Sequence, residues 1–340
     1  MEKQAELEAT IQAMVQAGKG LLAADESHPT IAKRFAAVGV ENSEENRRAY
    51  RSLLFHTPAA EEAISAVILF EETLEQADDQ GTALPQLLAQ RGIVPGIKVD
   101  KGKGPLPGAD GDMITYGLDG LAERLERYKD LGARFAKWRE VYPISDRNPT
   151  PLGLSANAEM LARYARVCQS VGIVPIVEPE VLIDGNHSLE RAQAVNERVL
   201  HAVFHALHQH GVLLEGMILK PSMVTPGKES GKAQPEVVAE ATLMTLRRTV
   251  PAAVPSINFL SGGQTPEEAT VNLQAINAMK GNAPWQLSFS YGRALQQPAM
   301  EAWQGKADRA KAGQAAFAKR ARLNAAACQG EYQPAMEEAD

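Results

Sequence analysis

The sequence predicts an α/β protein, a single (β/α)8 barrel of the TIM type with extra helices at both chain ends. Eight short apolar segments alternate with segments of helical periodicity along the 340 residues. Strands that alternate with helices pair in parallel through right-handed crossovers, and eight such units close a barrel. The competing layout is a doubly wound sheet, which requires a glycine-rich turn between a strand and a helix. The nearest match, residues 102–108, contains two prolines and is therefore expected to be a loop.

In the first half of the chain, strands are expected at residues 21–24, 66–70, 92–100 and 133–138. A helical pattern over residues 5–17 precedes them, and glycines end it. The helix expected at residues 43–55 has acidic residues at its start and arginines further on, the order that the helix dipole favours. Asp119 is expected to cap a helix over residues 120–131, which Gly132 ends.

In the second half, strands are expected at residues 173–177, 216–220, 256–260 and 285–289. Ser155 or Asn157 is expected to open a helix that runs through residue 171, and another helix covers residues 189–210. Pro235 is placed as the first residue of a helix that ends near residue 249. Residues 265–268 form a capping box for a helix that ends near residue 280. The connection at residues 222–234 is expected to be a mobile polar loop.

Composition limits the classes of function. The formal net charge of −7 argues against nucleic acid as the main partner. Cys168 and Cys328 are too few for a disulfide framework or a zinc site, and they fit a reducing cytosol. No apolar segment precedes the first helix as in a secretory signal, and none reaches the ~20 residues of a membrane span. We therefore expect a cytoplasmic protein with no membrane partner.

Ionisable and polar residues follow most of the expected strands. The carboxyl ends of barrel strands are where catalytic residues lie. Strand side chains alternate between two faces, so Lys98 with Asp100, and Glu178 with Glu180, can point the same way. Buried charges must be paired or used, so their convergence on one rim predicts an active site. The residues at these ends are Asp25, Glu71, Lys98, Asp100, Lys137, Arg139, Glu178, Glu180, Lys220, Ser261 and Arg293.

Lys220 ends the sixth expected strand, and Pro221, which has no N–H for a sheet, stops that strand. Met217, Ile218 and Leu219 precede it, so an ammonium here is poorly solvated and the free amine is favoured. A free lysine amine is a nucleophile for carbonyl carbon. An isolated lysine at a strand end more commonly extends into water. The surrounding charges favour the catalytic interpretation.

The rim is locally cationic in an acidic protein, which favours an anionic substrate. The cations are Lys98, Lys137, Arg139, Lys220 and Arg293. Residues 261–263 and 290–293, after the last two strands, resemble a nest of backbone N–H groups, and these two loops are the usual phosphate site of barrels. A simple turn is the alternative for the two glycines at 262 and 263.

Three histidines, His201, His205 and His208, share one helix face at a spacing that could bind a metal. No accompanying HExxH motif is present, and the helix is expected to lie outside the barrel. A solvated helix face is the favoured interpretation, and no metal site is expected.

The motifs at seven strand ends resemble those of class I fructose-1,6-bisphosphate aldolases, the metal-free Schiff-base type. The motifs are residues 23–27, 96–102, 135–139, 174–180, 219–221, 259–264 and 289–294. They stand in the order of that family and cover nearly the whole chain. The resemblance implies a lyase of glycolysis and gluconeogenesis that needs no cofactor and converts fructose 1,6-bisphosphate into dihydroxyacetone phosphate and glyceraldehyde 3-phosphate. It also implies a cytoplasmic homotetramer.

The resemblance implies a role for each site residue. Lys220 would form the Schiff base, and Glu178 would act as general acid and base for loss of water. Asp25 would help remove the C4-hydroxyl proton. Lys137 would keep Lys220 deprotonated by like-charge repulsion, and Glu180 would hold the lysines in position. The C1 phosphate would bind Ser261, Gly262, Gly263, Ser290, Gly292 and Arg293, and the C6 phosphate would face Ser27, Arg34, Lys98 and Arg139.

Two features depart from the family pattern. Residues 28–30 are His-Pro-Thr where the family usually has Thr-Gly-Ser, and no tyrosine ends the chain, Tyr332 being the nearest. We expect one domain over residues 1–340, with a flexible tail from about residue 331. Two other functions stay open: a Schiff-base aldolase for another sugar phosphate, and a non-catalytic scaffold that kept the fold.

Overall fold

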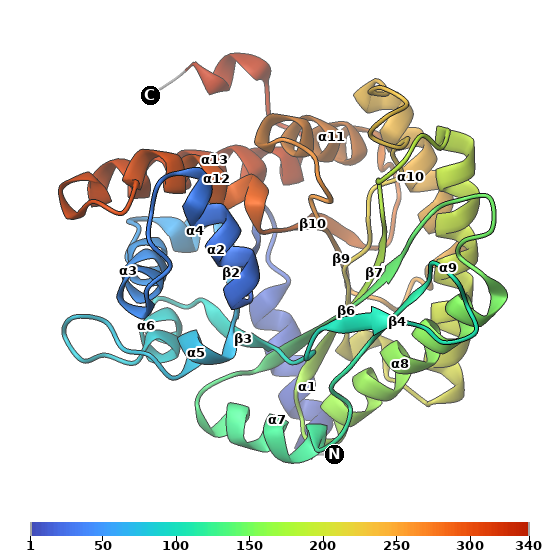
Figure 1. Cartoon of the computed structure of the whole chain (residues 1–340), viewed down its shortest axis with the longest axis horizontal. Coiled ribbons are helices and arrows are strands. Elements are labelled where there is room, and N and C mark those ends of the chain that lie inside the picture. The colour runs from blue at the N-terminus through green and yellow to red at the C-terminus, as the bar shows by residue number, and fades with distance from the viewer. Residues whose placement is uncertain (1, 339–340) are drawn as a thin grey trace.

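The computed structural model describes residues 2–338 and contains a closed barrel of eight parallel strands (Figure 1). The strands follow one another around the barrel in the order β1, β10, β9, β8, β7, β6, β3, β2. They are β1 (Gly20–Ala24), β2 (Ile64–Leu69), β3 (Val94–Lys98), β6 (Phe135–Tyr142), β7 (Val174–Val181), β8 (Ile218–Leu219), β9 (Ser256–Phe259) and β10 (Gln286–Tyr291). The predicted barrel fold is confirmed.

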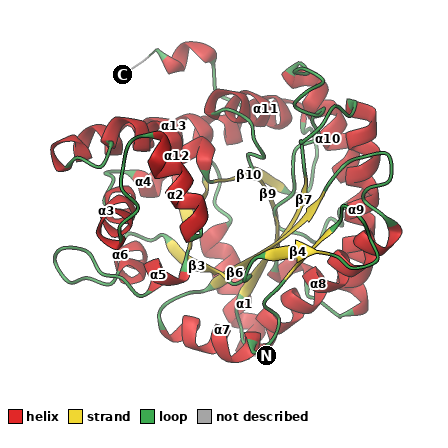
Figure 2. Ribbon diagram, in the orientation of Figure 1, coloured by secondary structure: helices red, strands yellow, loops and turns green. Residues whose placement is uncertain are grey.

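Helices form an outer layer around the strands (Figure 2). In chain order the helices are α1 (Glu2–Met14), α2 (His28–Ala37), α3 (Glu44–Phe55), α4 (Ala60–Ala63), α5 (Glu71–Leu74), α6 (Leu84–Gln90), α7 (Leu121–Asp130), α8 (Pro151–Ser170), α9 (Leu189–Gln209), α10 (Pro235–Thr249), α11 (Pro266–Met279), α12 (Arg293–Trp303) and α13 (Ala310–Gln329). Short 3-10 turns occur at Leu214–Gly216, Ala307–Arg309 and Pro334–Glu337. None of the helices within residues 2–338 is long and apolar enough to cross a membrane.

The first helix closes one end of the barrel. Leu7, Ile11 and Met14 of α1 pack in one buried cluster with inward-facing strand residues such as Phe135 and Val174. The Ser65 hydroxyl, near the start of β2, donates to the Met14 carbonyl at 2.6 Å. Helix α1 therefore covers the end of the barrel where the strands begin, and a pocket opens at the end where they finish.

Several helix starts follow the sequence prediction. The Ser43 hydroxyl accepts the Asn46 N–H at the start of α3, and Thr265 and Glu268 form the expected capping box of α11. Two expected starts are wrong. The cap of α7 is Gly120, whose φ of 61° is left-handed, and not Asp119. Helix α8 begins at Pro151 behind the capping hydroxyl of Thr150, because proline at the first helical turn needs no N–H partner.

The segment at residues 102–108, predicted to be a loop, contains a strand. Strands β4 (Lys103–Pro105) and β5 (Met113–Thr115) form a separate antiparallel hairpin. The hairpin has two strands only, so Pro105 lies in an edge strand, where a missing N–H is tolerated. The prediction missed the hairpin because it treated the prolines only as breakers of a strand–turn–helix unit.

The connection at residues 222–234 holds no helix or strand, as expected for a loop. Its first three residues are nevertheless buried, and the Val224 N–H donates to the Thr242 hydroxyl at 3.0 Å. The mobility of this connection stays a prediction, as do the single-domain organisation and the flexible tail. Residues 339 and 340 lie outside the described chain.

Candidate active site

A pocket of about 670 Å³ opens at the carboxyl ends of the barrel strands. All of the residues proposed from the sequence as catalytic or substrate-binding line it. Glu71, at the end of β2, does not. Its carboxylate pairs with Lys101 and Arg127 on the outer side of the barrel. The polar residues that line the pocket are Asp25, Glu26, Ser27, Thr30, Lys33, Arg34, Lys98, Asp100, Lys103, Thr115, Lys137, Arg139, Glu178, Glu180, Lys220, Ser261, Ser290 and Arg293.

Four charged side chains alternate in sign at the floor of the pocket. The Lys220 Nζ lies 3.2 Å from Glu178 Oε1. The other oxygen, Oε2, lies 3.2 Å from the Lys137 Nζ, which is also 2.8 Å from Asp25 Oδ2. Lys220, Glu178 and Lys137 are each less than 5% exposed. We call Asp25, Lys137, Glu178 and Lys220 the charged cluster.

The ion pairs set the protonation states of this cluster. Burial raises the pKa of Asp25 and of Glu178, but Lys137 and Lys220 outweigh that effect and hold both below their usual range. Burial lowers the pKa of Lys137, but Asp25 and Glu178 outweigh it and the net shift is upward. At neutral pH Asp25 and Glu178 are therefore carboxylates, and Lys137 carries a full positive charge. The Glu178 carboxylate, 3.2 Å from the Lys220 Nζ, is then available to accept a proton from Lys220.

Glu180 was expected to hold the lysines, but its carboxylate pairs with Arg139, with 2.5 Å between Oε2 and Nε. Burial raises the pKa of Glu180. The positive charge of Arg139 lowers it and the negative charge of Glu178 raises it, and the net shift is upward. The reason is positional. Glu180 lies two residues beyond Glu178 on β7, opposite Val141 of β6, and so nearer the pocket mouth than the charged cluster. Arg139, two residues before Val141, reaches it diagonally.

Backbone geometry supports an anion site after β9 and β10. Gly262 and Gly263 both have left-handed φ values, 45° and 87°, a conformation that glycine adopts without strain and in which successive N–H groups can converge. The Ser290 hydroxyl is buried and has no hydrogen-bond partner within residues 2–338. An unpaired buried hydroxyl in the pocket that these two glycines also line is what a bound phosphate would satisfy.

Arg34 lies beside this anion site. Its Nη2 is 3.7 Å from the position that a Cβ on Gly292 would occupy. The resemblance to class I aldolases implied that Arg34 would face the C6 phosphate. Helix α2 carries it instead toward β10, the neighbour of β1 in the barrel.

The opposite side of the pocket is also cationic. Lys98 lies over the Phe70 ring at 5.8 Å and 3.1 Å from Asp100 Oδ1.

The hydroxyls of Ser27 and Thr30 are 3.2 Å apart at the start of α2. Pro29 occupies the first turn of that helix, where proline favours helix initiation, so the His-Pro-Thr sequence builds a helix start here.

Comparison with known proteins agrees with this geometry. The model of the fructose-bisphosphate aldolase class-I family matches residues 6–340. The chain belongs to this family. It is 56% identical to cytosolic fructose-bisphosphate aldolase 6 of Arabidopsis thaliana over 315 residues, which cover 93% of this chain and 88% of that one. It is 54% identical to the cytoplasmic isozyme of Spinacia oleracea over 328 residues, 96% of this chain and 92% of that one.

A solved structure has the same fold. The Plasmodium falciparum fructose-bisphosphate aldolase, in a ternary complex with TRAP and a small-molecule inhibitor, superposes with a TM-score of 0.96 and 51% identity. The match covers 98% of this chain and 96% of that one. Identity at this level over nearly the full length shows that the two chains share the aldolase barrel.

Sequence reasoning missed some residues of this aldolase site. Lys33, Lys103 and Thr115 line the pocket, and they stand away from the strand ends that guided the prediction. Buried Glu26 pairs with Arg34 and, at 2.5 Å, with Arg51 of α3. The Glu26 ion pairs join residues from separate elements, so the sequence does not indicate which residues are paired. The only available signal was that Glu26 is a charged residue next to Asp25.

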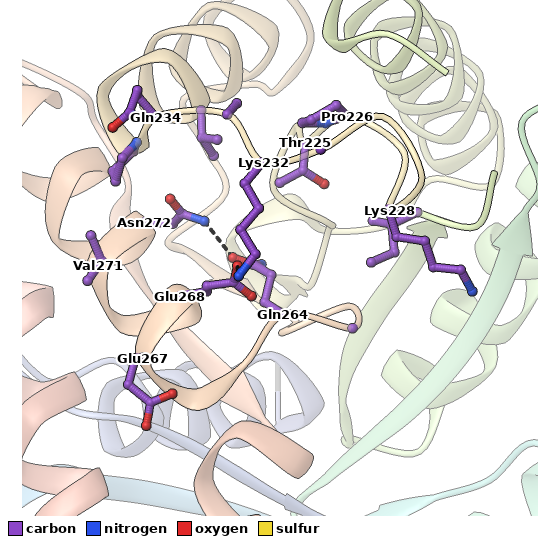
Figure 3. A pocket seen from close by; sticks show the side chains of 16 residues that line it. Thr225, Pro226, Lys228, Lys232, Gln234, Gln264, Glu267, Glu268, Val271 and Asn272 are labelled. Carbon is purple, nitrogen blue, oxygen red and sulfur yellow. Dashed lines mark hydrogen bonds and ion pairs between the residues drawn. The ribbon is translucent and has the colours of Figure 1, made fainter. Parts of the chain in front are cut away.

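A second cavity, of about 490 Å³, lies between the 222–234 connection and helices α10 and α11 (Figure 3). Lys232 pairs with Glu268 across it, and the Asn272 amide donates to Gln264 Oε1 at 2.6 Å. It shares Gly263 with the aldolase pocket but contains no member of the charged cluster. The histidines at 201, 205 and 208 lie apart from both cavities, on the exposed face of α9.

Proposed function

We propose that this aldolase cleaves fructose 1,6-bisphosphate to dihydroxyacetone phosphate and glyceraldehyde 3-phosphate, and catalyses the reverse condensation, through a Schiff base on Lys220. The observation that carries the proposal is the buried Lys220 Nζ at 3.2 Å from Glu178, between two cationic ends of one pocket. A ketose with a phosphate at each end fits this charge pattern.

In the first step, the Lys220 amine attacks the C2 carbonyl and forms a carbinolamine. Glu178 accepts the ammonium proton before attack and returns a proton to the departing hydroxyl, so that water leaves and a protonated imine remains. Glu178 is placed for both tasks because one of its oxygens lies 3.2 Å from the Lys220 Nζ and the other lies 3.2 Å from the Lys137 Nζ.

In the second step, the C4 hydroxyl loses its proton toward Asp25 as the C3–C4 bond breaks. The electrons of that bond move into the protonated imine and give an enamine, while glyceraldehyde 3-phosphate leaves. Lys137, 2.8 Å from Asp25, keeps that carboxylate in place. The enamine then takes a proton at C3, and water cleaves the imine to free dihydroxyacetone phosphate and Lys220.

The two phosphates would bind opposite ends of the pocket. We assign the C1 phosphate to Ser261, Gly262, Gly263, Ser290, Gly292 and Arg293, with Arg34 beside them. We assign the C6 phosphate to Ser27, Lys98 and Arg139. The unpaired Ser290 hydroxyl supports the first assignment, and the lysine and arginine side chains support the second.

We also propose a cytoplasmic location and a homotetramer. The Arabidopsis and spinach relatives are named cytosolic and cytoplasmic, which supports the first. The tetramer rests on the family resemblance, and light scattering that gives about four times 36.7 kDa would support it. A monomer or dimer mass would contradict it.

The function is tested by turnover. With purified protein in a coupled assay, we expect cleavage of fructose 1,6-bisphosphate that a chelator does not reduce, and slower cleavage of fructose 1-phosphate. Faster turnover of the monophosphate would favour an aldolase for another sugar phosphate. Background rates on both would favour a non-catalytic scaffold.

A further inference from the structure

Strand β6 carries a buried acid that the proposed mechanism does not use. Lys137 and Arg139 line the pocket, whereas Trp138 and Glu140 alternate with them and point away from it. Both outward side chains have no exposed surface. Burial raises the pKa of Glu140 to about 7, while hydrogen bonds from Trp138 and Thr115 act in the opposite direction. A carboxyl group in such a place is costly unless its partners are specific.

Both oxygens of Glu140 accept hydrogen bonds from N–H groups. The Trp138 Nε1 donates to Oε1 at 2.8 Å, and the backbone N–H of Thr115 donates to Oε2 at 3.2 Å. The Thr115 hydroxyl in turn donates to the Arg139 carbonyl at 2.8 Å. Thr115 of β5 is therefore attached to β6 by two hydrogen bonds, one to the Glu140 carboxylate and one to the Arg139 carbonyl.

The β4–β5 hairpin forms a wall of the pocket. Thr115 pairs with Lys103 across the hairpin, and the Tyr116 N–H donates to the Gly102 carbonyl at 2.8 Å. Gly102, Lys103 and Thr115 line the pocket together with Lys98 and Arg139. The position of the hairpin therefore fixes where Lys103 stands relative to the pocket.

We propose that Glu140 is a positioning residue, whose carboxylate holds the β4–β5 hairpin against β6 and so places Lys103 at the C6-phosphate end. The inference rests on the proposed function, because it assigns that end to a phosphate. Two acceptor oxygens are essential to it, so it applies to the ionised carboxylate, and the kinetic test is run at pH 8, above the raised pKa of Glu140. Glutamine has the same shape but one acceptor and one donor, so its amide N–H would oppose an N–H of Trp138 or Thr115.

The test compares Glu140→Gln with the wild type on fructose 1,6-bisphosphate and fructose 1-phosphate. We expect the KM for the bisphosphate to rise about three- to tenfold with kcat within about twofold, and the monophosphate constants to stay unchanged. Thr115→Val, which removes only the hydroxyl bond to Arg139, should shift the same KM in the same direction. Tyr142→Phe is the matched control, since it removes an outward β6 hydroxyl that has no partner within the described chain, and both KM values should stay unchanged.

An unchanged bisphosphate KM in a folded Glu140→Gln variant overturns the inference. Parallel losses on both substrates, with a lower Tm, also overturn it, because they indicate general destabilisation. If Glu140→Gln fails to fold, Thr115→Val decides by the same criterion. If the wild type cleaves neither ketose, the proposed function fails, and hydrogen exchange decides the role of Glu140. In that case the amides of residues 102 and 103 must exchange faster in Glu140→Gln, and equal exchange rates contradict the inference.

Discussion

Glu178 lies between the two lysines of the charged cluster and forms an ion pair with each of them. Replacing it with glutamine keeps the size of the side chain but removes the group that accepts and returns protons. We expect kcat of Glu178→Gln to fall by about 10²- to 10⁴-fold, the usual contribution of general acid–base catalysis. The control is Glu71→Gln, a strand-end acid outside the pocket, which should keep wild-type kcat. A Glu178→Gln variant with near wild-type kcat would remove Glu178 from the mechanism.

The charged cluster also links stability to pH. The pKa values of Asp25 and Glu178 are lower in the folded protein than the ordinary 3.8 and 4.5. Their contribution is therefore complete above those values and is lost as the pH falls through the folded-state pKa. Lys137 has the opposite sign, since its pKa is raised above 10.5 and its contribution is lost only at strongly alkaline pH.

Asp25→Asn tests this linkage. We expect its urea midpoint to lie below that of the wild type at pH 7, because Lys137 loses one carboxylate. The two midpoints should approach each other as the pH falls below about 4, because the unfolded wild type then binds a proton at Asp25 that the folded wild type does not. Midpoint curves that stay parallel from pH 3 to pH 7 would show that the pKa of Asp25 is the same in the folded and unfolded protein, which would contradict the linkage.

Among the elements, the β9–α11 turn connects the anion site to its surroundings. A Cβ on Gly263 would lie 2.6 Å from Ile183 Cδ1, and the residue has a left-handed φ of 87°. We expect Gly263→Ala to raise the KM for fructose 1,6-bisphosphate and for fructose 1-phosphate alike, because both carry the C1 phosphate. Adding Ile183→Ala should recover part of the loss by removing the clash.

The matched control is Gly211→Ala at the end of α9. Gly211 has a similar left-handed φ of 61°, but a Cβ there meets no atom of the described residues within 4 Å. We expect it to cost only ~1 kcal/mol of stability from backbone strain, with no change in KM. Equal KM changes in the two variants would attribute the effect of Gly263→Ala to strain in general.

Strands and their polar ends were predictable because each barrel strand is a short apolar segment that stops at a charged or polar residue. All eight strands overlap their predicted segments. The register of contacts between elements was not predictable. The pairing of Glu180 with Arg139, the turn of Arg34 toward Gly292 and the attachment of β5 to β6 each join residues from different elements. Local sequence carries no signal for such distances.

For the whole molecule, the Glu337 carboxylate is one of the groups that attach the end of the described chain to α13. The Glu337 carboxylate accepts hydrogen bonds from buried Arg320 at 2.6 and 2.9 Å and from the Tyr332 hydroxyl at 3.0 Å. Burial raises the pKa of Tyr332 to about 12, and its bond to Glu337 acts the same way. Tyr332 is therefore neutral at physiological pH and engaged with Glu337 of its own segment.

Glu337→Ala tests this attachment. It removes the carboxylate that is hydrogen-bonded to the buried Arg320 guanidinium and leaves only Glu267 Oε1 at 3.7 Å, and we expect a loss of ~1–3 kcal/mol in the free energy of unfolding. Limited proteolysis should cut after residue 331 faster in the variant, whereas kcat should stay unchanged because Glu337 lies outside the aldolase pocket. Proteolysis at the wild-type rate would mean that this segment opens freely without the mutation.

The central claim is that Lys220 forms the covalent intermediate. Borohydride reduction in the presence of dihydroxyacetone phosphate traps a Schiff base as a stable amine, and peptide mass spectrometry locates it. We expect a single adduct on Lys220, which Lys220→Arg abolishes while Lys137 and Lys98 stay unmodified in both proteins. An adduct on any other lysine, or none in a protein that cleaves fructose 1,6-bisphosphate, would contradict the account.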